Sequence, residues 1–285
     1  MNTIPFCGIC NCTNDAAKHG HIRCLKYLHK KGYSWNAKTC NLAAAYGHLK
    51  CLKYLHENGC PWDEEACEDA ARFGHIEILK YLHENGCPWE EEETCLSVAE
   101  SGSLDCLEYL HKEGCSLDED LCYIAVENGH IDILKYLHEN GCPWHEEACK
   151  VAAEKGHIEI LKYLHENGCP WDEEEACSAA AANGHLDCLE YLHKEGCSLD
   201  KYILIDAVEN GHIDILKYLH ENGCPWHKYS CEVAAKKGYL EILKFLHENG
   251  CPWDEEACKF ASENGHRDCL DYLHKNGYPC GHQSS

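Results

Sequence analysis

A nine-residue stretch that could offer a histidine and a thiol to a metal recurs along the chain. It reads YLHENGCPW and starts at Tyr54, Tyr81, Tyr136, Tyr163 and Tyr218. Imidazole nitrogen and thiolate sulfur are donors that zinc prefers. The stretch is therefore either a ligand site copied several times or a structural joint that the fold needs in every copy.

The expected distance between copies argues against sites shared by neighbouring copies. Equivalent residues on stacked helices lie about 8–10 Å apart. Donors bound to one zinc ion at about 2.0–2.3 Å must lie within roughly 4–5 Å of one another. Disulfides need Cα atoms about 4.4–6.8 Å apart. Equivalent histidines or thiols of neighbouring copies are therefore not expected to share a metal or to form a ladder of disulfides.

A site within one copy, such as His56 with Cys60 and Cys67, passes this distance test but fails on pattern. Leu204 takes the place of the second thiol in one copy, and Tyr33 takes the place of the first in another. A free cysteine packs as a small apolar side chain. We interpret these residues as packing elements and expect no metal or other cofactor. Scattered weak metal capture and a dedicated zinc protein are the alternatives.

The N-terminal stretch FCGICNC places Cys7, Cys10 and Cys12 in a C-x-x-C-x-C pattern. A redox C-x-x-C needs a βαβ context, and a zinc site needs a fourth ligand at a suitable spacing. We interpret the stretch as part of a capping unit. In the alternative, a metal site, His19 or His21 could supply the fourth ligand, and the sequence does not decide between the two.

Two series of glycines divide the chain into units and indicate the elements that carry these residues. Steps in both series are 27 or 28 residues, and together they hold 20 of the 22 glycines. The first series is Gly20, Gly47, Gly74, Gly102, Gly129, Gly156, Gly184, Gly211, Gly238 and Gly265; the second is Gly32, Gly59, Gly86, Gly114, Gly141, Gly168, Gly196, Gly223, Gly250 and Gly277. The chain is thus ten copies of one unit.

Each unit reads as two short helices. DEEACEDAARFG, from Asp63, is rich in alanine, begins with acids that suit the positive end of a helix dipole and ends at a glycine that can cap a helix. HIEILKYLHENG, from His75, places apolar residues on one helical face. The proline of CPW then cannot continue the helix. Such a hairpin cannot bury its apolar face alone, so the units are expected to stack.

The stretch EACEDAARFGHIEILKYLHENGCP resembles the ankyrin repeat, whose pattern reads T-P-L-H-L-A-A-x-x-G-H-x-x-x-V-x-L-L-L-x-x-G-A-D. The matching residues are Cys67 at the first leucine, Ala70 and Ala71 at the paired alanines, Gly74 and His75 at Gly-His, Leu79, Tyr81 and Leu82 in the second helix, Gly59 and Gly86 at the later glycine, and Cys60 at the following alanine. The resemblance implies an all-α fold, an ankyrin-like solenoid of about ten stacked helical hairpins.

The unit also departs from the ankyrin pattern. Its period is six residues shorter than the family's 33, and the missing residues fall between Trp62 and Glu65, where ankyrins build a β-hairpin finger. The opening Thr-Pro is absent. In this the units resemble the expanded ankyrin families of large DNA viruses and protists. Binding through fingers is therefore not carried over.

The repeat series sets the expected domain boundaries. Residues 1–10 are predicted to form an N-terminal cap segment, residues 11–277 a single solenoid, and residues 278–285 a short polar tail.

Composition limits the partners and the compartment. The formal net charge of −24 disfavours nucleic acid and anionic membranes, since such binding depends on cationic side chains. The chain shows no export signal and no apolar run of membrane-spanning length, so we expect an intracellular, cytoplasmic protein, in the host cytoplasm if the source is viral, with a nuclear location left open. The 25 cysteines are then expected to be reduced thiols.

No catalytic motif is present, and we expect no enzyme activity. A protein-interaction scaffold is the predicted function. A structural spacer without a specific partner and a thiol-rich metal or redox buffer are the alternatives.

Recognition must depend on residues that differ between units, because those that stay the same serve the stack. Among the exposed positions of the first helices, Tyr46, Arg72, Phe73 and Tyr123 are the candidate partner-binding residues, since aromatic and arginine side chains dominate interface energetics. The acidic surroundings favour a partner with a basic surface.

Overall fold

The computed structural model describes residues 10–253 and 256–277. Contacts divide the chain into two compact units, Met1–His145 (unit 1) and Glu146–Ser285 (unit 2). Each unit holds five helical hairpins. A continuous solenoid over residues 11–277 stays a prediction, and the predicted polar tail, like most of the cap segment, lies outside the described residues.

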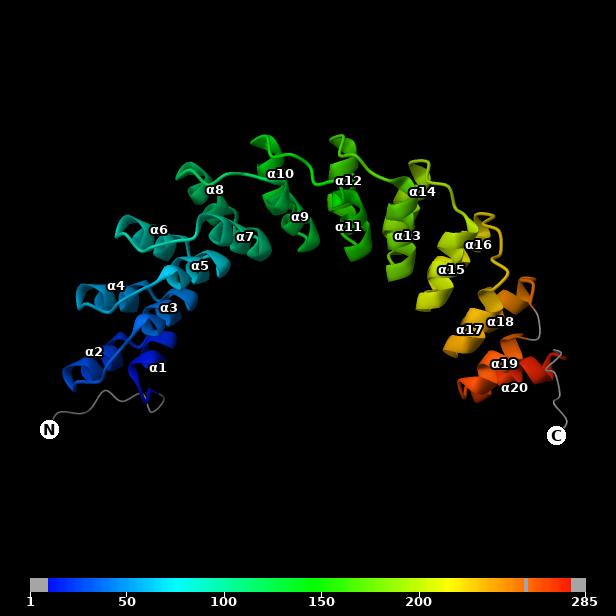
Figure 1. Cartoon of the computed structure of the whole chain (residues 1–285), viewed down its shortest axis with the longest axis horizontal. Coiled ribbons are helices and arrows are strands. Elements are labelled where there is room, and N and C mark those ends of the chain that lie inside the picture. The colour runs from blue at the N-terminus through cyan, green and yellow to red at the C-terminus, as the bar shows by residue number, and fades with distance from the viewer. Residues whose placement is uncertain (1–9, 254–255, 278–285) are drawn as a thin grey trace. The chain divides into compact units, whose positions relative to one another are not determined.

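In each unit, odd-numbered helices are the first helices of the hairpins and even-numbered helices the second (Figure 1). The helices of unit 1 are α1 Thr13–Lys18, α2 Ile22–Lys30, α3 Ala37–Ala45, α4 Leu49–Glu57, α5 Glu64–Arg72, α6 Ile76–Glu84, α7 Glu91–Ser101, α8 Leu104–Lys112, α9 Glu119–Glu127 and α10 Ile131–Glu139. Those of unit 2 are α11 Ala148–Lys155, α12 Ile158–Glu166, α13 Glu173–Asn183, α14 Leu186–Lys194, α15 Lys201–Asn210, α16 Ile213–Glu221, α17 Ser230–Lys237, α18 Leu240–Glu248, α19 Glu256–Glu263 and α20 Arg267–Lys275.

Helix ends follow the local sequence. Helix α5 begins after Asp63, which occupies the N-cap, and carries Glu64 and Glu65 in its first turn, where carboxylates suit the helix dipole. It ends at Phe73, and Gly74 follows with a φ of +69°. That left-handed conformation turns the chain into α6 at little cost because glycine has no Cβ.

The core lies between hairpins and consists of small residues on the odd-numbered helices and larger ones on the even-numbered helices. Ala70 and Ala71 of α5 and Leu79 and Leu82 of α6 are all 0% exposed. The paired alanines let neighbouring odd-numbered helices approach closely, while the leucines fill the space between even-numbered ones.

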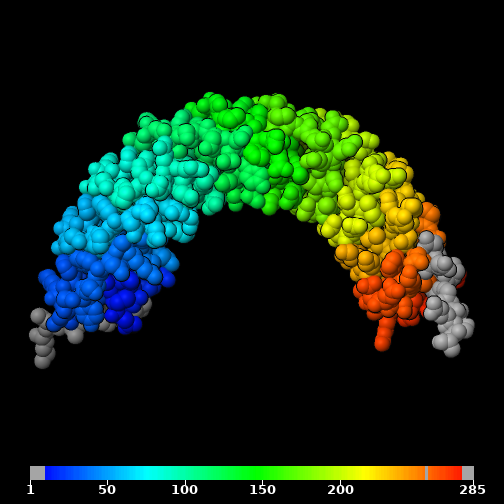
Figure 2. Space-filling view, in the orientation of Figure 1, coloured from blue at the N-terminus to red at the C-terminus, as the bar shows by residue number. Residues whose placement is uncertain are grey.

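Within each unit the main contacts join the two helices of a hairpin, or equivalent helices of neighbouring hairpins, such as α3 with α5 and α13 with α15. The colours of the space-filling view accordingly follow one another in chain order along each unit (Figure 2). No strand occurs in residues 10–253 and 256–277. The predicted all-α fold of stacked helical hairpins is confirmed.

Candidate interaction surface

The histidine of YLHENGCPW joins one hairpin to the next. His56 Nδ1 lies 2.9 Å from the hydroxyl of Tyr81, which belongs to the following hairpin. The same contact, at 2.6–2.8 Å, links His29 to Tyr54, His83 to Tyr109, His111 to Tyr136, His165 to Tyr191, His193 to Tyr218 and His247 to Tyr272. Phe245 stands opposite His220 with the rings 5.7 Å apart. These recurring contacts identify the stretch as a structural joint.

The tryptophan of the same stretch completes this joint. The ring of Trp62 stacks on that of His56 with centroids 3.9 Å apart, and meets Tyr81 of the next hairpin edge-on at 6.4 Å. Offset and edge-to-face arrangements of this kind are favourable for aromatic rings. The tryptophan therefore fills the space between hairpins.

The Gly-His histidines start the even-numbered helices, as predicted, but their bonds run between hairpins. His75 occupies the N-cap of α6 without a side-chain capping bond, and its Nε2 donates to the carbonyl of Ala45, 30 residues earlier, at 3.1 Å. A Cβ on Gly47 would lie 2.9 Å from this ring. The glycine of the preceding hairpin leaves room for the ring.

Most thiols of the repeated positions are packing elements. Cys60 and Cys67 are 4% and 0% exposed. The Cys60 thiol donates to the carbonyl of Asn36 in the preceding hairpin at 3.3 Å. Burial raises the pKa of the Cys51 thiol to about 11, so this thiol is neutral at physiological pH.

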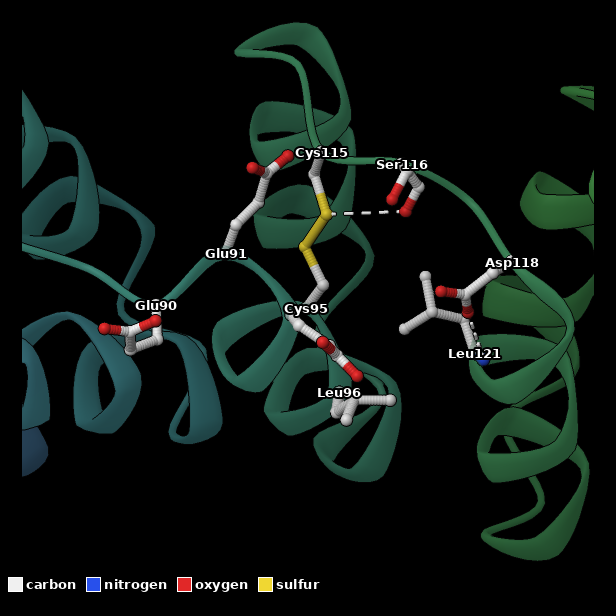
Figure 3. A pocket seen from close by; sticks show the side chains of 9 residues that line it. Glu90, Glu91, Cys95, Leu96, Cys115, Ser116, Asp118 and Leu121 are labelled. Atoms are coloured by element: carbon white, nitrogen blue, oxygen red, sulfur yellow. Dashed lines mark hydrogen bonds between the residues drawn. A yellow bond between two sulfur atoms is a disulfide. The ribbon is translucent and has the colours of Figure 1, made fainter.

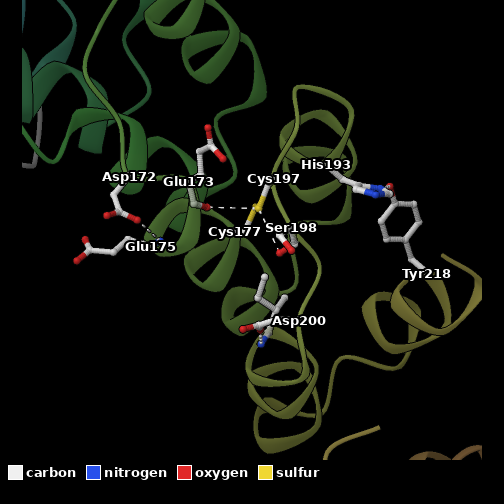
Figure 4. The surroundings of a disulfide bond; sticks show 10 residues. Asp172, Glu173, Glu175, Cys177, His193, Cys197, Ser198, Asp200 and Tyr218 are labelled. Carbon is white, nitrogen blue, oxygen red and sulfur yellow. Dashed lines mark hydrogen bonds between the residues drawn. A yellow bond between two sulfur atoms is a disulfide. The ribbon is translucent and has the colours of Figure 1, made fainter. Parts of the chain in front are cut away.

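Five of the described cysteines depart from the expected reduced state: four pair with one another, and Cys258 is also disulfide-bonded. Disulfides join Cys95 to Cys115 (Figure 3) and Cys177 to Cys197 (Figure 4). The distance limit that excludes disulfides applies to equivalent residues of neighbouring copies. Each bond instead joins the odd-numbered helix of a hairpin to the link that follows its even-numbered helix, where the Cα atoms are 7.2 and 7.0 Å apart. The prediction of reduced thiols is therefore wrong for these four residues and for Cys258.

Other hairpins carry a thiol pair at the same two positions, and contact between its members alters their acidity. Hydrogen bonding to Cys60, followed by burial, raises the pKa of Cys40. Hydrogen bonding to Cys67, followed by burial, likewise raises the pKa of Cys87 above the ordinary thiol value. Cys40 and Cys87 are therefore neutral at physiological pH, whereas hydrogen bonding to Cys149 lowers the pKa of Cys169.

Acidic side chains surround the first disulfide. A cavity of about 450 Å³ lies beside it, and Figure 3 shows its lining from α7, from the link after α8 and from α9. The acids that line it are Glu90, Glu91, Glu92 and Asp118. Figure 4 shows the second disulfide within one hairpin and the His193–Tyr218 contact between two hairpins.

Cys12 and His19 are engaged in local contacts at the ends of α1. Cys12 occupies the N-cap of α1, where its Sγ accepts from the backbone N–H of Asp15 at 3.5 Å. His19 Nδ1 donates to the carbonyl of the same residue, Asp15, at 2.8 Å. Neither side chain therefore belongs to a group of metal ligands.

Cys10 and His21 do come together, with Cys10 Sγ 3.1 Å from His21 Nδ1. Cys24, in the first turn of α2, completes the group, since the ligand atoms of all three residues lie within 4.8 Å of one another. The motif had not included Cys24, because in the repeat pattern it reads as one more core thiol. Cys7 lies outside the described residues.

Three of the four candidate binding residues sit on neighbouring helices of unit 1. Tyr46 and Phe73 occupy the C-caps of α3 and α5 and are 49% and 56% exposed. Arg72, the last residue of α5, forms an ion pair with Glu68. Tyr123 lies further along, on α9, and is half-buried edge-on against His145. The structure thus brings Tyr46, Arg72 and Phe73 to adjacent helix ends and places Tyr123 apart from them.

Two exposed tyrosines of unit 2 were missed. Tyr202 and Tyr229 are 60% and 45% exposed. They lie two residues before the position of the odd-helix thiol, where most units have an acid such as Glu65 or Glu147. A comparison of the units at this position finds them, because tyrosine replaces an acid there.

Beside Tyr202, unit 2 has a cavity of about 660 Å³ whose charged lining residues are mostly acidic. Its charged residues are Lys150, Glu154, Glu174, Glu175, Asp200 and Asp206. The single lysine is paired with Glu175 at 3.3 Å and with Glu147 at 3.1 Å. The other carboxylates leave this cavity with a negative field.

Asp15, Asp69 and Asp206 occupy a position that is apolar in most other units, and the pKa is raised at the last two. Burial raises the pKa of Asp69 to about 6. Burial also raises the pKa of Asp206, against the lowering effect of a hydrogen bond from Ser178. Equivalent residues include Val151 and Ala179, so each of these two aspartates carries its charge into a partly apolar environment.

Comparisons with known proteins agree with this architecture. Models described as ankyrin repeats in 3 copies and in many copies match residues 13–88, 67–148 and 149–229, and residues 231–274, respectively. No curated protein matches. The crystal structure of the human ASB11 ankyrin repeat domain is similar in fold, with a TM-score of 0.55 and 22% sequence identity over 66% of this chain and 99% of that one.

Ankyrin repeats are generally protein–protein interaction modules, which fits a surface in which repeated residues hold the hairpins together and variable ones face solvent. In the described ranges, no helix combines the length and apolarity needed to cross a membrane. Because family models match most of its length, the chain belongs to the ankyrin-repeat family.

Proposed function

We propose that this chain is a non-catalytic scaffold that binds a protein partner through the exposed ends of α3 and α5. Tyr46, Phe73 and Arg72 are the main contacts, and Tyr123 is a secondary one. The observation that carries the proposal is the exposure of Tyr46 and Phe73, at 49% and 56%, at equivalent positions of adjacent hairpins. Aromatic and arginine side chains are enriched among the residues that dominate interface energetics.

The Tyr46 ring and the Arg72 side chain already have contacts within the chain, which favours a preformed binding surface. Lys18 Nζ lies 5.2 Å from the centroid of the Tyr46 ring. The guanidinium group of Arg72, next to Phe73, is held by Glu68 and lies 3.4 Å from the Ser97 hydroxyl. Side chains already held in place lose less conformational entropy when a partner binds.

The charge of the chain supports a partner with a basic surface. The formal net charge is −24, and the cavity beside Tyr202 adds a local group of carboxylates in unit 2. Complementary charge accelerates association, and this acceleration falls as salt rises. We also place the protein in a reducing compartment such as the cytoplasm, since most described cysteines are free thiols.

The test begins with affinity capture of a partner and continues with measured affinities for the purified pair. Tyr46→Ala combined with Phe73→Ala should weaken binding by about 2 kcal/mol or more and leave the melting temperature nearly unchanged. Tyr33→Ala is the matched control, because Tyr33 is 50% exposed but lies in the link between α2 and α3.

The outcomes separate this proposal from its alternatives. Equal binding by the double variant and by wild type would move recognition away from α3 and α5, and loss of binding with Tyr202→Ala instead would place it in unit 2. A double variant that unfolds would show that the rings belong to the core. Failure to capture any partner would favour the spacer.

A further inference from the structure

The cluster of Cys10, His21 and Cys24 has the composition and spacing of a metal site. Cys10 Sγ lies 3.1 Å from His21 Nδ1, and the ligand atoms of the three residues all lie within 4.8 Å of one another. Both thiols are nearly buried, Cys10 at 1% and Cys24 at 7% exposure. We propose that these three side chains bind a zinc-type divalent ion that ties the segment before α1 to the start of α2.

The distances suit a tetrahedral ion. With zinc about 2.3 Å from sulfur and about 2.0–2.1 Å from nitrogen, donor atoms of one site lie roughly 3.5–4 Å apart. The Cys10–His21 separation of 3.1 Å and the upper limit of 4.8 Å for the other pairs are close to this range, so small side-chain rotations can close the site. Two thiolates and one imidazole leave one tetrahedral position for a water molecule or another donor.

His21 differs from its equivalents in interior hairpins. In His48 and His75 the ring nitrogen Nε2 donates to a backbone carbonyl 30 residues earlier, at 3.0 and 3.1 Å. His21 instead presents Nδ1 to the thiol of Cys10. The same repeat position thus carries a structural hydrogen bond in the interior and faces a potential metal ligand in the first hairpin.

Cys24 also differs from its equivalents in interior hairpins. Cys51 occupies the same place in α4, is 0% exposed and has a pKa raised to about 11 by burial, as expected of a core thiol. In residues 10–253 and 256–277, the group around Cys24 is the only set of three or more His, Cys or carboxylate side chains whose ligand atoms meet this spacing. Cys24 is at a core position of the repeat, and it becomes part of a ligand set because the segment before α1 places Cys10 beside it.

Metal binding here would have a defined chemistry. Each thiol must release its proton to bind, so uptake of the ion is favoured as pH rises. Cys12, two residues from Cys10, is used to cap α1 and stays outside the site. Among the described residues the ligand pattern is therefore Cys10, His21 and Cys24, and Cys7 of the C-x-x-C-x-C motif lies outside them.

Cobalt(II) titration of the full, reduced chain tests the proposal. Tetrahedral thiolate coordination should produce an ultraviolet charge-transfer band and intense visible bands that saturate at one equivalent of cobalt and disappear when zinc is added. Cys10→Ser and Cys24→Ser should abolish the charge-transfer band or weaken cobalt binding at least tenfold. Cys12→Ser and Cys51→Ser are the matched controls and should keep the wild-type spectrum.

A second measurement covers the case in which Cys24→Ser fails to fold. In the wild-type chain, added zinc should slow alkylation of Cys10, read by peptide mass spectrometry, and a chelator should restore the rate. His21→Asn, which circular dichroism must show to be folded, should lose this protection. The proposal is overturned if cobalt gives no charge-transfer band, if Cys10→Ser keeps the wild-type spectrum, or if zinc leaves the alkylation rate of Cys10 unchanged.

Discussion

The even-numbered helices of this protein repeat their contacts from hairpin to hairpin, whereas the exposed ends of the odd-numbered helices do not. The His56–Tyr81 contact is copied at six further junctions with almost the same distance. The residue at the C-cap of the odd-numbered helix changes instead from Tyr46 to Phe73 and Asn128. Side chains that touch the next hairpin are thus uniform, while those that meet solvent vary.

This difference separates stacking from recognition. A repeat protein is stabilised by the interface that each hairpin makes with the next, and a substitution on that interface affects the whole stack. At the solvent-facing helix ends a substitution changes only what the surface presents. The two regions should therefore respond differently to mutation, and four measurements can break or sharpen that contrast.

The largest effect is expected at the junction of Gly47 with His75. Gly47 has a positive φ of +77°, and a Cβ added there would lie 2.9 Å from the His75 ring. Gly47→Ala should therefore destabilise the protein by about 2–4 kcal/mol. Gly59→Ala is the matched control, since its φ is +79° but nothing lies within 4 Å of the added Cβ; it should cost about 1–2 kcal/mol. Urea denaturation measures both. Equal losses would show that the histidine does not need this space.

The next effect concerns the histidine–tyrosine contact. Tyr81→Phe removes the hydroxyl that lies 2.9 Å from His56 and should cost about 1 kcal/mol. The chain supplies the reverse experiment, because Phe245 already occupies this place opposite His220. Phe245→Tyr should raise the unfolding midpoint in urea, and a decrease would contradict the stabilising role given to the contact.

On the odd-numbered helices, Asp69 should make stability depend on pH. Its pKa in the folded state is about 6, above the ordinary 3.8, so the folded chain binds this proton more tightly than the unfolded chain does. The stabilising contribution is then present below about pH 4 and is lost as pH rises through 6.

Asp69→Asn should therefore raise stability at pH 7 by about 1 kcal/mol, a value reduced because the group is only half-buried and solvent screens it. The gain over wild type should disappear near pH 4. Asp206→Asn should raise stability less, because the hydrogen bond that Asp206 accepts from Ser178 already stabilises its charged form. Thermal melts between pH 4 and pH 7 check both, and a gain that persists unchanged at pH 4 would contradict burial as the cause.

The smallest effect is expected from metal removal. The interior hairpins are held by packing and by contacts such as His56–Tyr81, and the proposed ligand set involves only the first hairpin. Melting curves with and without a strong chelator, followed by circular dichroism, should therefore coincide. A loss of several degrees would mean that metal contributes to the stack as a whole.

The sequence alone was sufficient for the fold. Two glycine series and an apolar helical face predicted hairpins such as α5 and α6 to within one or two residues of their observed ends. Such patterns are local, since a cap or an amphipathic face depends on residues a few positions apart. The exposure of Tyr46 and Phe73 followed from the same repeat comparison, because positions that vary between units are those that the stack does not use.

Contacts between residues far apart in the chain were decided only by the tertiary structure. The bonds of His75 to Ala45 and of Cys95 to Cys115 join positions 30 and 20 residues apart. Cys24 reads as a core thiol in the repeat pattern, and only the folded chain brings it to Cys10 and His21. A repeat pattern fixes which residues are equivalent, but the direction of a side chain depends on the neighbour that it meets. The sequence thus determined the hairpins and their order, and the packing of one hairpin against another determined the partners of these side chains.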